Sequence, residues 1–178
     1  MGKATVSRMG AGVVAAALAV GALTIPAAAQ GAVVTRGAFT ALPAAAGQPE
    51  HDLAGRAQLE RIGEDTSHVS VRVSGLRPGV TYGIHLHNAS CAAANPGGGH
   101  YKHDAAGLAQ PPNELWPSSS AHDTLAGLTA NSAGVASGRG SADWLAGSSA
   151  VSVVLHAGIG HGATTTAGGP KLACADLR

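Results

Sequence analysis

The sequence predicts an all-β protein, and two observations support this fold class. First, 26 glycines and 9 prolines make up about a fifth of the 178 residues, which suits many short strands better than a helical bundle. Second, several segments alternate apolar and polar residues with the two-residue period of a half-buried strand. The length fits one domain, since about 150 residues per domain is typical. We therefore expect a single all-β domain.

Charged residues are few and nearly balanced. They form 12% of the chain, against roughly 25% in an average soluble domain, and the formal net charge is +1. A protein that grips nucleic acid with basic stripes would carry more positive charge than this. We therefore expect no nucleic-acid partner.

The first 29 residues have the pattern of a cleaved secretory signal peptide. Lys3 and Arg8 form a basic start, residues 9–25 form an uncharged apolar run, and residues 26–29 are small enough for cleavage. The alternative is a membrane-anchoring helix, because a run of about 17 residues could nearly span a bilayer. With the signal removed, we expect a protein of the extracellular or cell-wall space with no membrane partner.

Residues 30–52 carry a weaker pattern than the rest of the chain. They are rich in alanine, glycine and proline around one apolar run, 31–42. We expect them to form an N-terminal linker or a strand that leads into the main domain, residues 53–178.

Strand signals become regular from residue 54 onward. The clearest alternation places Val69, Val71 and Val73 on one face, with Ser70 and Arg72 on the other. Turn-forming residues separate the early segments. The expected strands are 54–61, 68–76, 80–87, 127–131, 134–142, 151–156 and 171–177.

A long segment without periodicity, residues 88–126, follows the third of these strands. A structureless loop of nearly 40 residues is uncommon in a compact domain, and such loops are usually functional. A second loop is expected at 157–169. We therefore expect the chemistry of the protein to lie beside these loops.

The two cysteines, Cys91 and Cys174, favour a disulfide, because an exported protein enters a compartment where disulfides persist. The bridge would contribute about 4 kcal/mol by the chain-entropy model. A pair of thiolates in a metal site and a free pair remain as alternatives. Neither cysteine has a partner at the C-x-x-C spacing that a thiolate site would favour.

Histidines carry the strongest functional signal. Five of the nine fall in or beside the long loop and the strand before it. His85 and His87 are two residues apart on an expected strand, so both imidazoles project from one face. Imidazole is a preferred ligand of copper and zinc. The other candidate ligands are His100, His103, His122 and His156.

Five segments carry a further signal: Gly83–His87, Cys91, Gly98–Tyr101, Val153–Ala157 and Gly168–Cys174. In this order they resemble segments of the copper/zinc superoxide dismutase family. The resemblance implies a Greek-key β-sandwich or barrel with long metal-binding loops and one disulfide. Both a monomer and a homodimer remain open.

The resemblance implies that His85, His87, His100 and His156 bind copper, a set of nitrogen ligands that suits Cu(II). It also pairs Cys91 with Cys174. The implied reaction is conversion of superoxide to oxygen and hydrogen peroxide. His100 has a catalytic role by the same resemblance, because the corresponding family histidine leaves the reduced copper and takes a proton.

The zinc-binding segment departs from the family pattern. The family has two further histidines and an aspartate with a His-x-x-Asp arrangement, whereas this chain has His103 close to His100, and His122 directly before Asp123. These three residues are candidates for an altered zinc site. If zinc is absent, His100 needs another partner for its second ring nitrogen. Glu114 is our candidate for that role.

A second departure concerns the residue that attracts superoxide. The family uses an arginine beside the copper, and Lys171 stands at that place here. Lysine keeps the charge but lacks the planar fork of arginine, so we expect weaker guidance of the anion. Two alternatives to a dismutase remain: a secreted copper-binding or copper-buffering domain without activity, and a metal-free structural sandwich.

Overall fold

The computed structural model describes residues 1, 31–45, 50, 52–120, 127–158 and 168–178. This part of the chain is all-β, as the sequence predicts, and its one helical segment is a short 3-10 turn, Pro43–Ala45. Among these residues, no helix has the length and apolar character needed to span a bilayer.

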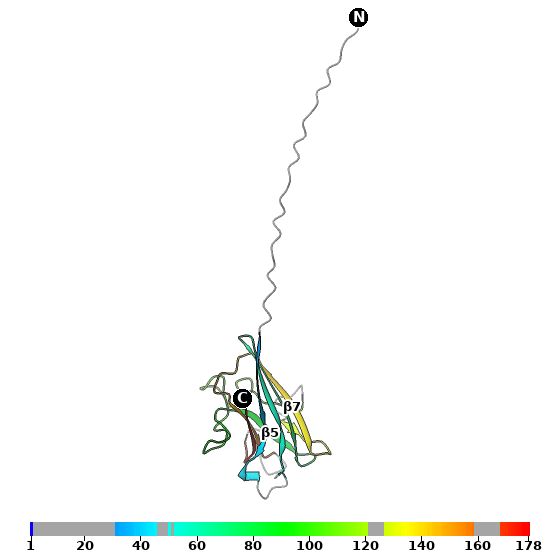
Figure 1. The fold of residues 1–178 in the computed structure, drawn as a ribbon, viewed down its shortest axis with the longest axis vertical. Helices are drawn as coiled ribbons and strands as arrows, with labels where there is room; N and C mark the ends of the chain where they lie inside the picture. Colours follow the sequence, from blue (N-terminus) through cyan, green and yellow to red (C-terminus); the bar gives the residue numbers. More distant parts are fainter. Residues whose placement is uncertain (2–30, 46–49, 51, 121–126, 159–167) are drawn as a thin grey trace.

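The strands form two antiparallel sheets (Figure 1). The four-stranded sheet has the order β1-β3-β4-β7, and the five-stranded sheet has the order β2-β9-β8-β5-β6. The first sheet contains β1 (Ala32–Ala38), β3 (Ala54–Ile62), β4 (Thr66–Ser74) and β7 (Val135–Ala142). The second contains β2 (Thr40–Ala41), β5 (Thr81–His87), β6 (Leu128–Thr129), β8 (Ser152–His156) and β9 (Lys171–Asp176).

All seven strands expected after residue 54 are present, with small shifts at their ends. The largest shift is in β4, which begins two residues before the expected start because Thr66 already pairs with Ile62 of β3. Only three residues are left for the turn, and Gly63 adopts a φ of 61° there, a conformation that glycine reaches without a steric penalty. The N-terminal apolar run forms β1, which pairs with β3, and β2, which pairs with β9 in the other sheet.

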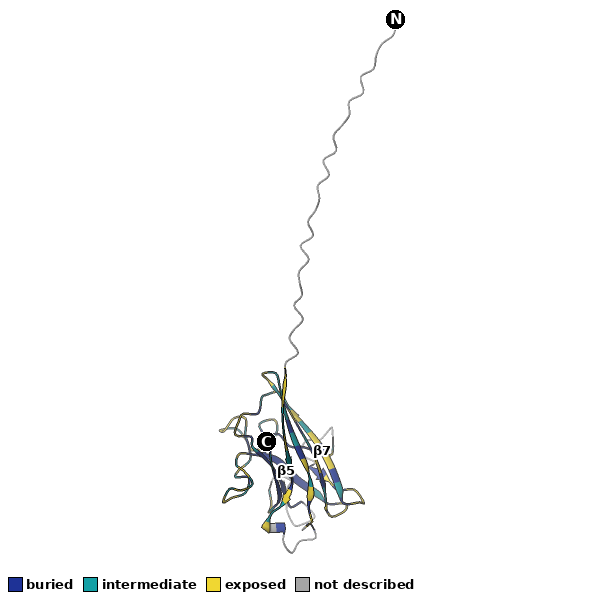
Figure 2. Cartoon of the chain, viewed as in Figure 1, coloured by how far each residue is buried: buried dark blue, intermediate teal, exposed yellow. Residues whose placement is uncertain are grey.

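One hydrophobic core receives side chains from both sheets, which gives the protein a β-sandwich architecture. Leu59, Val71 and Val73 of the four-stranded sheet are buried with Ile84 and Leu155 of the five-stranded sheet. Figure 2 shows the burial of the strands. Full burial of a side chain of this size contributes about 1.5–3 kcal/mol, so the alternation that predicts the strands also stabilises the sandwich.

A disulfide joins Cys91, in the loop after β5, to Cys174 in β9. This confirms the pairing expected from the sequence. The backbone N–H of Cys91 also donates a hydrogen bond of 2.7 Å to Asp176 in the same strand. The bridge is consistent with an extracellular or otherwise oxidising compartment, and it fastens the start of the long loop to the five-stranded sheet.

Candidate metal centre

Strand β5 is buried on both faces, and its alternation separates the core from the candidate site. Ile84 and Leu86 point into the hydrophobic core, so His85 and His87 project from the opposite face. Both histidines are at most 1% exposed. Buried imidazoles require polar partners or a metal ion. The residues that cover this face of β5 must therefore supply such partners or help to bind a metal ion.

His156 reaches the same face from the neighbouring strand β8. In the register between these strands, His156 lies opposite Gly83, and Val154 lies opposite His85. Residues that are opposite or two apart share a face of the sheet, so His156 is on the side of His85 and His87. The ring centroids of His156 and His85 lie 5.0 Å apart.

His100 is brought to the site by the long loop, which returns along β5. His100 forms an isolated antiparallel bridge with His87, and Tyr101 donates a backbone hydrogen bond of 2.8 Å to Leu86. The loop turns through Gly97, with a φ of 75°. A Cβ at Gly97 would lie 2.4 Å from a methyl group of Val154, so only glycine fits beneath the histidines.

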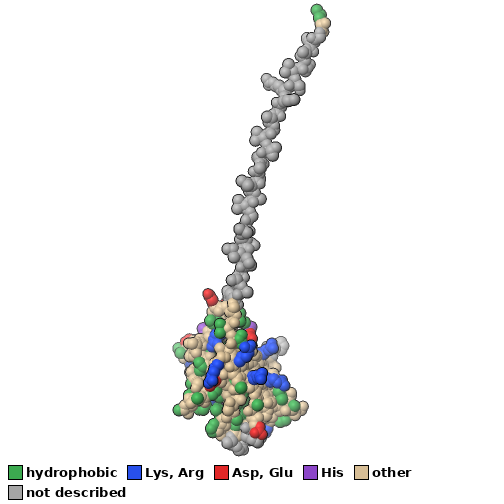
Figure 3. Space-filling view, viewed as in Figure 1, with side chains coloured by type: hydrophobic (Ala, Val, Ile, Leu, Met, Phe, Trp, Pro, Cys, Tyr) green, Lys and Arg blue, Asp and Glu red, His purple; other side chains and the backbone are tan. Residues whose placement is uncertain are grey.

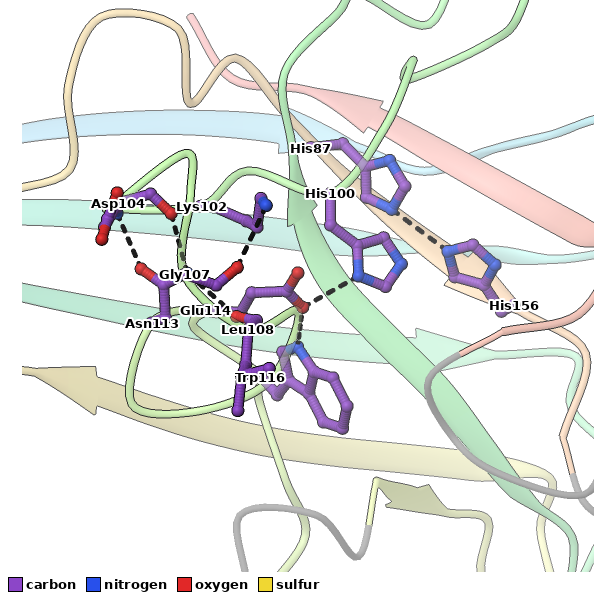
Figure 4. A network of polar contacts seen from close by, with 10 residues as sticks. All are labelled: His87, His100, Lys102, Asp104, Gly107, Leu108, Asn113, Glu114, Trp116 and His156. Atoms are coloured by element: carbon purple, nitrogen blue, oxygen red, sulfur yellow. Dashed lines mark hydrogen bonds and ion pairs between the residues drawn. The ribbon is translucent and has the colours of Figure 1, made fainter.

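The four histidines expected to bind copper therefore meet at one place. Figure 4 shows three of them, His87, His100 and His156. Each offers a ring nitrogen, and these atoms lie within 4.8 Å of one another. The Nε2 atoms of His87 and His156 are 3.1 Å apart, and the Nδ1 atom of His156 donates to the carbonyl oxygen of Gly169 at 3.1 Å. A set of converging buried nitrogens fits a metal ion.

Burial also keeps two of these imidazoles, those of His87 and His156, neutral. It lowers the pKa of His87 to about 3, with smaller contributions from the positive charges of His156, His100 and Lys171. Burial likewise lowers the pKa of His156 to about 4. A neutral imidazole keeps a lone pair for a metal ion, whereas a protonated one does not. At physiological pH, both side chains are therefore ready to act as ligands.

Glu114 lies against the second ring nitrogen of His100. The Nδ1 atom of His100 donates a hydrogen bond of 2.8 Å to the Oε2 atom of Glu114, whose side chain is 1% exposed. The indole N–H of Trp116 donates to the same oxygen at 2.6 Å. With Nδ1 occupied as a donor, Nε2 is the nitrogen that His100 presents to the other histidines. Glu114 thus orients the ring and selects its tautomer.

Neither a scan against protein-family models nor a search of curated proteins finds a match for this chain. The residues therefore carry the assignment. In the part of the chain that the structure describes, these four histidines are the one group of three or more ligand-type side chains that could hold a metal ion. The protein is a candidate metal-binding protein.

Trp116 is a member of the site that the sequence analysis does not identify. Its ring centroid lies 4.6 Å from that of His85, and the residue is 5% exposed. It forms one wall of the site and supports Glu114 at the same time. The sequence spacing of Glu114 and Trp116 does not by itself indicate that both residues reach the histidines. That inference requires knowing that the loop returns to β5.

A side-chain network fixes the loop that carries His100 and Glu114. Asn113 accepts a hydrogen bond of 2.7 Å from the backbone N–H of Asp104, and its amide donates to the carbonyl oxygens of Asp104 and Leu108 at 2.9 Å each (Figure 4). This network closes the loop directly before Glu114. Several hydrogen bonds of Asn113, rather than a single contact, therefore fix the backbone next to Glu114.

Lys171 lies beside the site, and its ammonium group is engaged by the loop. Its Nζ atom donates to Asn95 at 2.8 Å and to the carbonyl oxygens of Pro96 and Gly98 at 2.8 and 2.6 Å. Partial burial lowers the pKa of this lysine. The contacts show that Lys171 holds the segment before His100 in place.

Of the three candidates for a zinc site, the structure describes only His103, which does not join this cluster. His103 is exposed and stacks on Trp144, with ring centroids 4.9 Å apart and planes inclined by 11°. His122 and Asp123 lie outside the described residues. The Nδ1 atom of His100, which a second metal would need, donates instead to Glu114.

Proposed function

We propose that this protein is a copper-dependent superoxide dismutase with a Greek-key β-sandwich, similar to the copper/zinc superoxide dismutases. The observation that carries the proposal is the convergence of four imidazoles from β5, β8 and the long loop, with ring nitrogens within 4.8 Å. The sheet orders, in which strands distant in sequence are neighbours, and the disulfide are compatible with that family.

The donor set favours copper over magnesium and calcium. Four nitrogen ligands without a thiolate or carboxylate in direct reach suit Cu(II), whereas magnesium and calcium prefer oxygen ligands. A copper ion held by His85, His87, His100 and His156 supplies a one-electron redox couple, which the conversion of two superoxide anions and two protons to oxygen and hydrogen peroxide requires.

In this proposal Glu114 takes the place that zinc has in the family. The carboxylate accepts the Nδ1 proton of His100 in a hydrogen bond, so the ring is held with Nε2 toward the other three histidines. A zinc ion on Nδ1 and a proton donated to Glu114 exclude each other, because that nitrogen has one position for a partner. We therefore propose a copper-only enzyme.

Lys171 supports binding of an anion by its charge, even though the loop engages its ammonium group. Its positive charge contributes to the lowered pKa values of His87 and His156, so its field extends into the site. A cation beside the site attracts a small anion such as superoxide, and salt weakens this attraction.

The test combines metal content with activity on one sample. The protein is loaded with copper and zinc together, dialysed, analysed for both elements, and assayed for superoxide decay against the metal-free sample. We expect one copper, less than a stoichiometric amount of zinc, and activity that requires copper. A stoichiometric zinc content would contradict the copper-only form, and a copper-loaded protein without activity would contradict the dismutase.

A secreted copper-binding domain without activity is the second candidate. The observation in its favour is that three oxygen atoms of the loop surround the ammonium group of Lys171. A strongly solvated or free cation would guide superoxide more effectively. Copper bound without superoxide decay, at low and at high ionic strength, would favour this candidate.

A further inference from the structure

The outer face of the four-stranded sheet carries a cluster of arginines far from the histidines in sequence. Arg36, Arg56, Arg72 and Arg139 come one from each of β1, β3, β4 and β7, and all four are exposed. Figure 3 shows basic side chains gathered on the face that carries β7. In a chain whose formal net charge is +1, this local concentration needs an explanation.

The strand register places these side chains on one face in two adjacent rows. One row runs from Arg36 through Gln58 and Ser70 to Arg139. In the next row, Arg56 and Arg72 lie directly opposite each other. With strands about 4.8 Å apart, the backbone positions of the two outermost arginines, Arg36 and Arg139, are roughly 14 Å apart across the sheet.

The arginine cluster has one carboxylate beside it, Glu60 on β3, which accepts a hydrogen bond from Gln58 and forms no ion pair with the arginines. Like charges directly opposite each other on neighbouring strands destabilise a sheet. Among the described residues, no carboxylate forms an ion pair with any of the four arginines. The contacts that the structure gives them are with neutral groups: Arg36 donates to Gln58 at 2.9 Å, and Arg72 donates to Ser137 at 3.4 Å. An external anion would relieve the repulsion.

The arginines border a groove with a volume of about 860 Å³. Between the cations, the groove is lined by hydroxyl and amide side chains, among them Gln58, Ser70, Ser119 and Ser137. None of the described residues that line it is aromatic. Guanidinium groups match the oxygen atoms of sulfate and phosphate in paired hydrogen bonds, while hydroxyl and amide groups pair with the hydroxyl groups of sugars.

We propose that this groove binds an acidic polysaccharide that carries sulfate or phosphate esters. Charge complementarity favours a polyanion, and the serine and glutamine lining favours a glycan. Proteins that bind single-stranded nucleic acid combine a basic groove with aromatic platforms for the bases, which are absent from the described lining of this groove. The disulfide is consistent with an oxidising compartment, where such glycans occur. Binding would tether the protein to an anionic matrix, whether or not it is a dismutase.

Titration calorimetry on the full protein at fixed ionic strength tests this proposal. The probes are a heparin octasaccharide, which carries sulfate, an octameric phosphomannan, which carries phosphate, a ten-nucleotide single-stranded DNA and neutral dextran. We expect binding of at least one charged glycan and none of dextran. The two glycan probes distinguish a sulfate from a phosphate ligand, and either result supports the proposal. Tighter binding of the DNA, or no binding of either glycan, would overturn it.

Matched variants locate the site. We expect Arg56→Gln and Arg72→Gln to weaken glycan binding about tenfold each, because each removes charge-assisted hydrogen bonds. Arg77→Gln removes the same charge from an exposed position outside the groove and should change the affinity less than twofold. The melting temperature of each variant reports on folding. Equal losses of glycan affinity in Arg77→Gln and Arg56→Gln would show that the overall charge of the protein attracts the glycan. That result would contradict the assignment of the groove as the binding site.

Discussion

The ammonium group of Lys171 donates a hydrogen bond of 2.6 Å to the carbonyl oxygen of Gly98, two residues before His100. Lys171 begins β9, and Gly98 belongs to the loop after β5, so this bond connects two distant parts of the chain. Together with the disulfide, which also joins this loop to β9, it holds the loop that presents one of the four candidate ligands.

We therefore predict that Lys171→Met destabilises the protein by about 1–3 kcal/mol, because three loop oxygens lose a charged donor. The copper affinity should fall as well, since His100 is less firmly held. Urea unfolding and copper titration measure the two effects. Lys102→Met is the matched control, because Lys102 also donates to loop carbonyls, of Ala105 and Gly107. An unchanged copper affinity in Lys171→Met would show that the lysine acts by charge alone.

Glu114→Gln tests the carboxylate beside His100. The amide has nearly the same size but lacks the negative charge, so the hydrogen bond from His100 becomes weaker. Loss of such a partner typically lowers metal affinity or activity about 10–100-fold, and we expect a loss in this range by competition with a copper chelator and by superoxide decay. Trp116→Phe removes the other donor to Glu114 and should have a smaller effect. Equal copper affinity in Glu114→Gln and the unmodified protein would contradict the role of Glu114.

The stability of the metal-free protein should depend on pH in a defined direction. His87 and His156 have pKa values of about 3 and about 4 in the folded protein, against an ordinary value of 6.5. Between these values, the unfolded chain binds protons that the folded chain does not. The free energy of unfolding therefore falls as the pH is lowered from about 6.5 toward 4.

Urea midpoints of chelator-treated protein at pH 7.5, 6 and 5 measure this dependence. The double variant His87→Leu/His156→Leu lacks both groups and should show a flatter dependence. A midpoint that rises as the pH falls, or an equally steep fall in the double variant, would contradict the assignment of low pKa values to this pair.

The disulfide should contribute strongly to stability, because it closes a long loop. Cys91 and Cys174 are separated by 83 positions, and the chain-entropy model gives about 4 kcal/mol for a loop of this length. We expect Cys91→Ser/Cys174→Ser to lose roughly this free energy of unfolding in urea titrations, without loss of the all-β circular dichroism spectrum. A difference below about 1 kcal/mol would contradict this role.

Much of the fold could be predicted from local patterns. The alternation of Val69, Val71 and Val73 predicts β4, because every second residue of a strand faces the core. The weaker pattern before residue 54 leaves open whether that segment is a linker or a strand. It forms β1 because it pairs with β3, and its own composition does not predict this pairing. Such pairing is a long-range property that local patterns do not contain.

The candidate site could be predicted in part. His85 and His87 have ligand spacing on a strand, but their meeting with His100 and His156 was inferred from the family resemblance. The contacts of Glu114 and Lys171 depend on how the long loop folds back on β5 and β9. No periodic signal in residues 88–120 encodes that path, so Trp116 was missed and the hydrogen bonds of Lys171 were not foreseen.

The central claim is that the four buried histidines hold copper and support dismutation of superoxide. The most direct measurement is the copper content and superoxide decay rate of His87→Ala beside His68→Ala. His87 is fully buried in the cluster, whereas His68 is exposed on β4. We predict that His87→Ala loses both copper and activity, and that His68→Ala keeps both. Stoichiometric copper and unchanged activity in His87→Ala would contradict the account.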